Sequence, residues 1–305
     1  MSTPVLSIVV VGFDMARELP RTVQSLLPPY QQGIDLADIE IIVVDNGSAD
    51  PVQRTDFGHE GNITVLRVED GGTSPCRAIN RGAALARADR LAVMIDGARM
   101  ASPGLLATAV QASRIDPDAF IATLGFHLGP KVQQISTSEG YTRAVEDQML
   151  ADIGWPADGY RLFEICALGE SYAHGVLQTP PETTFFLMGR DRFLKMGGYN
   201  EAFTGLGGGL SSFDFFNRAV ADPEVPFIML VGEGTFHQLH YGATTREGGV
   251  RRPAPEGEGT LGDVYAREYQ AITGQPLAMA TALPLLFGRL KHPAARHYFF
   301  PTVHD

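Results

Sequence analysis

The chain has 305 residues, 44% of them hydrophobic and 19% charged, which is typical of a globular protein with one large domain or two lobes. Its formal net charge of -11 argues against a general nucleic-acid-binding surface. Two distant cysteines indicate neither a disulfide framework nor a zinc site, and no apolar run is long enough to cross a bilayer. The amino terminus lacks the basic segment of a secretory signal, so we expect a cytoplasmic protein.

Apolar runs alternate with helical segments through the first part of the chain. We expect strands at residues 6–13, 39–45, 63–68 and 91–95, and helices at about 20–27, 75–87 and from 103 onward. This alternation predicts an α/β fold, with a mostly parallel central sheet and helices on both faces. The common phosphate loops are missing, because Gly12-Phe13-Asp14-Met15 follows the first strand in place of GxGxxG and no GxxxxGK[ST] occurs.

Two of these strands end in a carboxylate. Asp45 ends the run IEIIVVD, and Asp96 follows the run LAVMI. Open α/β sheets bind ligands outside the carboxyl ends of their strands. Either aspartate alone fits a simple turn former, but together they predict a ligand site between the two strand ends.

The second half of the chain is less regular. We expect strands at about 119–128, 182–188 and 226–231, and helices at about 141–152, 190–196, 211–221 and 263–273. Residues 242–262 are rich in Gly, Pro, Glu and Arg, so a linker or mobile lid is expected there, with Arg246, Arg251 and Arg252 on it. The apolar stretch 277–287 is expected to pack on the core, with a homodimer contact or a peripheral membrane contact as alternatives.

In this order, the motifs resemble those of family-2 inverting glycosyltransferases with the GT-A fold. The resemblance spans residues 6 to about 240, through LSIVVVGFD, IEIIVVDNGSAD, AINRGAALARADRLAVMIDGA, FLKMGGYNEAF and GGGLSSFDFFNRA. It implies a GT-A domain over residues 1–241, with a nucleotide-binding half at about 1–100 and an acceptor half at about 101–241. Residues 242–305 would then form the lid or linker and a C-terminal helical extension.

The resemblance also implies a reaction. A sugar moves from a nucleotide-diphosphate donor, with UDP the expected nucleotide, to a hydroxyl of a glycan or lipid-linked saccharide, with inversion. Such chemistry needs a general base for the acceptor proton and positive charge on the departing diphosphate. Mn²⁺ or Mg²⁺ is the expected cofactor.

Each matching position receives a role from the resemblance. Positions at the nucleotide base are Val11, Gly12, Phe13, Asp14 and Asp45, and Arg77 belongs to a loop that closes over the nucleotide. Asp96 is the first carboxylate of the DxD motif, which holds the metal, and His237 or His240 completes the metal shell. Asp214 lies in the helix where the family has its catalytic base. Less support exists for three further candidates, His127, His174 and Glu182.

Two departures from the family pattern leave alternatives open. The DxD motif reads Asp96-Gly97-Ala98, so a metal would depend on one carboxylate and a histidine, or Arg99 would bind the phosphates without a metal. The Glu-Asp pair ahead of the acceptor helix reads Ser211-Ser212, so Asp214 is either the base or a first-turn carboxylate favoured by the helix dipole. The alternative function is a GT-A domain that binds a nucleotide or glycan with little or no turnover.

Overall fold

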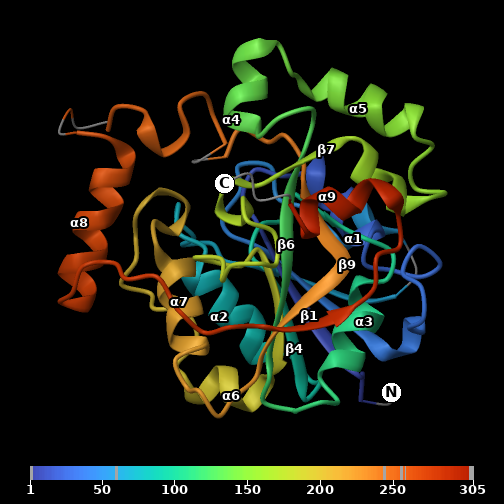
Figure 1. The fold of residues 1–305 in the computed structure, drawn as a ribbon, viewed down its shortest axis with the longest axis horizontal. Coiled ribbons are helices and arrows are strands. Elements are labelled where there is room, and N and C mark those ends of the chain that lie inside the picture. Colours follow the sequence, from blue (N-terminus) through green and yellow to red (C-terminus); the bar gives the residue numbers. More distant parts are fainter. Residues whose placement is uncertain (1–2, 59–60, 243–244, 255–256, 258, 302–305) are drawn as a thin grey trace.

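A mixed sheet runs through the whole molecule (Figure 1). The computed structural model describes residues 3–58, 61–242, 245–254, 257 and 259–301. In these residues ten strands form one sheet in the order β10-β9-β6-β8-β4-β1-β2-β3, with β5 paired to β9 and β7 to β6. The strands are β1 Leu6–Gly12, β2 Ile39–Asp45, β3 Asn62–Arg67, β4 Arg90–Met94, β5 Arg99–Ala101, β6 Phe120–Leu128, β7 Cys166–Leu168, β8 Phe185–Gly189, β9 Phe227–His237 and β10 Leu285–Gly288.

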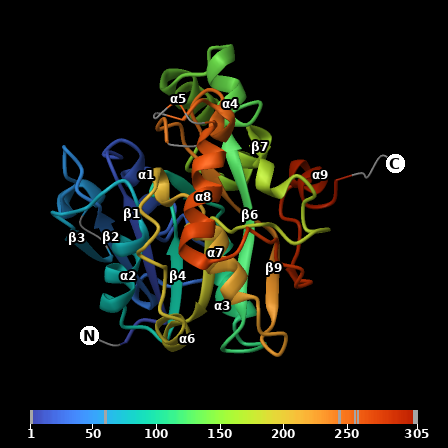
Figure 2. The same cartoon turned by 90° about the vertical axis from the view of Figure 1, so that its left-hand side faces the viewer.

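Helices cover both faces of this sheet (Figure 2). They are α1 Glu18–Gln24, α2 Cys76–Leu85, α3 Leu105–Ala112, α4 Gln133–Ser136, α5 Arg143–Asp152, α6 Arg190–Lys195, α7 Ser211–Ala219, α8 Leu261–Thr273 and α9 Arg296–Phe299. The expected α/β fold with helices on both faces is therefore confirmed. Within the described ranges, none of the helices has the length and apolar composition needed to span a membrane.

Alternate residues of β1 point into two separate cores. Val9 and Val11 pack in one core with residues of α2 and α7, and Ile8 and Val10 pack in the other with residues of α1 and α3. A strand buried on both faces needs apolar side chains at every position, which explains the continuous apolar runs of β1 and β2.

Strands β4, β1, β2 and β3 are mutually parallel and therefore end at one edge of the sheet. Gly12 at the end of β1 is paired with Asp45 at the end of β2. On the other side of β1, the Gly97 amide donates to the Val11 carbonyl at 2.7 Å. Asp45 and Asp96 thus lie on either side of the end of β1, as the strand pattern predicted. Strand β8 is inserted antiparallel between β4 and β6.

The C-terminal segment contributes to the sheet as well as to the helices. Helix α8 lies beside α7 at one edge of the molecule (Figures 1 and 2), and its residues agree with the helix predicted at about 263–273. Strand β10 pairs in parallel with β9, although four residues were too few for the sequence to indicate a strand there. Phe299 of α9 is fully buried in the core. The stretch 277–287, which was expected to pack on the core, does so only in part. Leu277, Ala280, Ala282 and Phe287 are partly buried against the two cores, whereas Met279, Leu283, Leu285 and Leu286 are exposed.

Candidate functional site

Asp96 and the two histidines meet beyond the ends of β4 and β9. The Nε2 atom of His237 lies 2.8 Å from Oδ2 of Asp96 and 3.0 Å from Nε2 of His240, and the His240 atom lies 3.4 Å from the same Oδ2. One ligand atom from each residue lies within 4.8 Å of the others, so the three side chains could hold one metal ion. The sheet makes this meeting possible, because His237 is the last residue of β9 and Asp96 follows β4.

Gln133 of α4 fixes the orientation of His237. Its Nε2 donates to the His237 carbonyl at 2.8 Å, so Oε1 of the same amide faces Nδ1 of His237 at 2.7 Å. An amide oxygen can only accept a hydrogen bond, so Nδ1 carries the proton and Nε2 presents a lone pair. That lone pair points at the Asp96 carboxylate. Two facing lone pairs at 2.8 Å fit a site that a cation would occupy.

The protonation states suit a metal. Burial lowers the pKa of His237 to about 4, so its imidazole is neutral near neutral pH. For Asp96, burial favours the neutral acid, but the neighbouring His240 and His237 hold its pKa well below the usual range. One carboxylate oxygen and two imidazole nitrogens form a donor set that Mn²⁺ accepts, and the remaining positions are left to phosphate or water oxygens.

Ala98, which stands where the DxD motif has its second carboxylate, has no room for a larger polar side chain. Ala98 is fully buried, its amide donates to Oδ1 of Asp96 at 2.9 Å, and its carbonyl accepts from the Gln238 amide at 2.7 Å. An aspartate at this position would be packed among apolar side chains. His240 instead supplies the third group of the cluster.

Arg99 is the notable cation beside this cluster. It lies on β5, where it pairs with His237 of β9. Among the described residues, nothing hydrogen-bonds its buried Nε and Nη1 atoms. Its charge contributes to the pKa values of His127, His237 and Glu182, so the guanidinium lies among these groups. Buried N–H groups without an acceptor are unfavourable unless an anion binds to them.

On the other side of β1, both carboxylate oxygens of Asp45 accept hydrogen bonds. Its Oδ1 accepts from the Ser48 amide at 2.8 Å, and its Oδ2 accepts from Arg67 of β3 at 3.0 Å. Asp14 joins the same turn, because its amide donates to Ser48 Oγ and its Oδ1 accepts from the Ala49 amide, each at 2.8 Å. Asp14 has a φ of 53°, in the left-handed region that aspartate tolerates. The predicted nucleotide end is thus a rigid double turn.

Arg77 and Asp214 lie apart from the cluster of Asp96, His237 and His240. Arg77 forms an ion pair with Asp70 at 2.6 Å across the loop before α2. Asp214 forms an ion pair with Arg218 at 2.9 Å and lines a pocket of 580 Å³ together with Asn80 and Tyr199. The pairing with Arg218 is the arrangement expected of a structural carboxylate. The role of Asp214 as the base therefore stays a prediction that this geometry does not favour.

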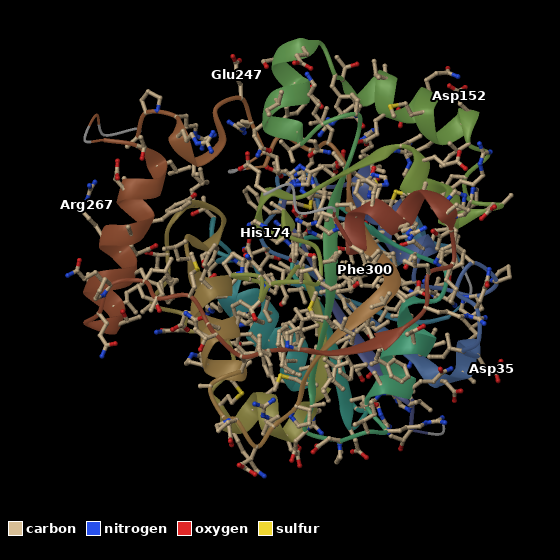
Figure 3. All side chains as sticks on the ribbon, in the orientation of Figure 1. Asp35, Asp152, His174, Glu247, Arg267 and Phe300 are labelled. Atoms are coloured by element: carbon tan, nitrogen blue, oxygen red, sulfur yellow. The ribbon has the colours of Figure 1, made fainter. Side chains whose placement is uncertain are left out.

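Of the candidates with less support, His127 lies beside the cluster and His174 does not. The His127 ring lies 5.4 Å from the His237 ring, and burial lowers its pKa. His174 is exposed on the loop after the short turn at residues 170–172 (Figure 3). In the expected lid, Arg246 donates to the Tyr241 carbonyl at 2.6 Å, whereas residues 243–244, 255–256 and 258 lie outside the described residues.

Sequence reasoning missed three positioning residues. Gln133 orients His237, Arg67 pairs with Asp45, and Glu146 of α5 accepts from the Leu239 amide at 2.7 Å between the two histidines. None of them belongs to a motif or lies near its partner in sequence. Only the pairing of β2 with β3 could have indicated one of them, because it places Arg67 opposite Asp45.

Comparisons with known proteins place the sequence in a family. The sequence model of a family described as "Glycosyltransferase like family 2" matches residues 10–231. Validoxylamine A glucosyltransferase of Streptomyces hygroscopicus subsp. jinggangensis (strain 5008) is 29% identical over 216 residues, which are 67% of this chain and 49% of that protein. This chain therefore spans about half the length of that curated relative.

One solved structure shows a shared fold. The structure of S. aureus TarS has a TM-score of 0.52 and 12% identity, and the match covers 77% of this chain and 36% of that chain. A TarS fragment, residues 1–349, solved in complex with UDP-GlcNAc, has a TM-score of 0.47 and 10% identity over 76% of this chain and 56% of that chain. At these identities the likeness concerns the fold alone.

Proposed function

The chain belongs to glycosyltransferase-like family 2, and from this premise we propose that it transfers a sugar from a nucleoside-diphosphate donor to a hydroxyl group. The observation that carries the proposal is the Asp96–His237–His240 cluster beside the unpartnered buried atoms of Arg99. A carboxylate, two imidazoles and a cation in one place fit a metal-bound diphosphate. The name of the 29% identical relative supports a hexosyl donor, and the resemblance favours UDP.

Each residue has a proposed task. Asp96, His237 and His240 would hold Mn²⁺ or Mg²⁺, which would supply positive charge to the departing diphosphate when bound. Arg99 would bind a phosphate oxygen through its free N–H groups. The turns at Asp14 and Asp45 would form the floor under the nucleotide base, next to Val11, Gly12 and Phe13, and Arg77 would belong to the loop over it. We expect the reaction to invert the anomeric configuration in a single displacement. The expected acceptor is a hydroxyl of a glycan or of a lipid-linked saccharide.

Donor binding is the first test. We expect UDP-sugars to raise the melting temperature in the presence of Mn²⁺, because a ligand that binds only the folded state stabilises it by mass action. EDTA or the Asp96→Ala substitution should abolish most of this shift, and UDP release should follow the same dependence. Binding that persists unchanged in EDTA and disappears in Arg99→Ala would assign the phosphates to Arg99 without a metal.

A second candidate function is binding without turnover. It is favoured by the ion pair that engages Asp214, since the predicted base is then unavailable. Tight UDP binding with no UDP release from any donor or acceptor would support this candidate over the enzyme. The predicted cytoplasmic setting, homodimer and peripheral membrane contact stay predictions.

A further inference from the structure

The carboxylate of helix α7 is held in an ion pair by a neighbouring arginine. The helix begins with Ser211 and Ser212, and Asp214 is held by Arg218 at 2.9 Å. The same guanidinium donates to the Met196 and Gly198 carbonyls, at 3.1 and 2.8 Å. The guanidinium therefore holds Asp214 in a fixed ion pair within the packing of this helix. A carboxylate on another element is a better candidate for the base of the proposed transfer.

Glu182 lies just before β8, at the edge of the sheet where Asp96 lies. Strands β4 and β8 pair antiparallel with Met94 opposite Phe185, and the pairing continues, because the Ile95 amide donates to the Thr184 carbonyl at 3.3 Å. The next residues along the two chains are Asp96 and Thr183, so Glu182 follows directly. Thr184 also contacts Thr235 of β9 through their hydroxyls at 2.9 Å, two residues before His237.

Only one oxygen of the Glu182 carboxylate accepts a hydrogen bond. Its Oε1 accepts a hydrogen bond from Ser171 at 2.8 Å, and Oε2 has no partner within the described parts of the chain. The side chain is neither fully buried nor fully exposed. Burial raises its pKa, and the Ser171 hydroxyl and the Arg99 charge oppose this shift without cancelling it. The carboxylate is therefore both accessible and more basic than an ordinary glutamate.

We propose that Glu182 is the general base that accepts the proton of the acceptor hydroxyl. This inference rests on the proposed glycosyl transfer. The acceptor oxygen forms a bond to the anomeric carbon as the bond from that carbon to the diphosphate oxygen breaks, and the electron pair leaves with the diphosphate. The acceptor proton passes to Oε2 of Glu182 and is released to water after the product leaves. The Arg99 charge favours the charged form of Glu182, and its buried Nε and Nη1 atoms would bind the leaving phosphate.

The charged and titratable groups around Glu182 come from three directions. Arg99 faces it from β5, Tyr172 from the turn at residues 170–172, and Tyr199 from the loop before α7. Burial raises the pKa of both tyrosines well beyond neutral pH, so neither changes charge in the range where the carboxyl titrates. His237, whose pKa burial lowers to about 4, also titrates on the acid side, so the acid limb is assigned to Glu182 only by its loss in the Glu182→Gln variant.

The test compares Glu182→Gln with Glu170→Gln, a matched change at an exposed glutamate 12 residues earlier. In Glu182→Gln we expect kcat to fall about 100-fold or more, the usual effect of losing a general base, with the donor Kd within about twofold of wild type. The wild-type kcat/KM should rise with pH through a pKa above the ordinary glutamate value of about 4.3, and this limb should vanish in the variant. Glu170→Gln should behave as wild type in both measurements.

Two outcomes would separate the proposals. If wild type releases no UDP from any donor but binds UDP, the proposed transfer fails, and the role of Glu182 fails with it. If wild type is active and folded Glu182→Gln keeps its kcat and acid limb, the role of Glu182 alone is overturned. The Asp214→Asn variant completes the comparison, since loss of the acid limb there, with Glu182→Gln unaffected, would return the base to Asp214.

Discussion

The side-chain amide of Gln133 contacts His237 twice, through Nε2 to the backbone carbonyl at 2.8 Å and through Oε1 to Nδ1 at 2.7 Å. The contact fixes both the ring orientation and the position of its proton. The lone pair of Nε2 is thereby directed at Asp96 before any metal binds. Gln133 of helix α4 therefore orients the cluster before a metal binds.

Replacing Gln133 should weaken the metal site without touching a ligand. In Gln133→Leu, His237 loses its partner, and we expect Mn²⁺ affinity to fall about 10- to 100-fold, as for other groups that orient a metal ligand. Isothermal titration with Mn²⁺ measures this directly. Gln111→Leu, the same change at an exposed position of α3, is the control. Equal Mn²⁺ affinity in Gln133→Leu and wild type would contradict the assignment of the site.

Arg99 should contribute to binding but not to stability. Removing its charge in Arg99→Met deletes no hydrogen bond of the buried Nε and Nη1 atoms, so the melting temperature should stay the same or rise. Donor affinity should fall about 10- to 100-fold, because a charge-assisted hydrogen bond contributes about 1.5–3 kcal/mol. Thermal unfolding checks the melting temperature, and donor titration checks the affinity. Arg114→Met, at an exposed position, is the control for both. A lower melting temperature with unchanged donor affinity would indicate a structural role.

Glu146 should stabilise the segment between the two histidines. Its Oε2 accepts from the Leu239 amide at 2.7 Å and from the Tyr141 hydroxyl at 3.1 Å, inside the protein. Glu146→Leu leaves both donors buried and unpaired, so we expect a loss of about 1–3 kcal/mol in unfolding free energy per group. Chemical denaturation measures it. Glu146→Gln keeps an acceptor oxygen and should lose less, and equal losses in the two variants would disprove the explanation.

Glu268 of α8 should hold the glycine-rich loop before α7. Its Oε1 accepts from the Thr204 and Gly205 amides at 2.9 and 2.8 Å, while Arg267 next to it points to the outer side of the helix (Figure 3). In Glu268→Ala we expect faster hydrogen exchange at residues 204–209, since local opening needs less free energy. Arg267→Ala is the control for the helix itself. Protection that is unchanged in Glu268→Ala would show that the loop is held by other contacts.

Much of the fold and part of the site could be read from the sequence. The strands β1, β2 and β4 were evident because burial on both faces requires unbroken apolar runs, and an aspartate directly after a parallel strand must lie at the carboxyl edge of the sheet. The position of Asp45 and Asp96 at one edge of the sheet follows from these local patterns. The choice of His237 and His240 came instead from the resemblance to the family.

Only the tertiary structure decided which of these groups are free to act. Arg218 lies one helical turn from Asp214, but the contacts of its guanidinium with Met196 and Gly198 that fix this ion pair depend on how the loop before α7 packs. Glu182 gained its position because β8 enters the sheet antiparallel to β4, and no local pattern encodes that insertion. Gln133 is 104 residues from His237 in sequence. Hydrogen-bond partners at such separations are set by the packing of whole elements, so sequence periodicity carries no signal for them.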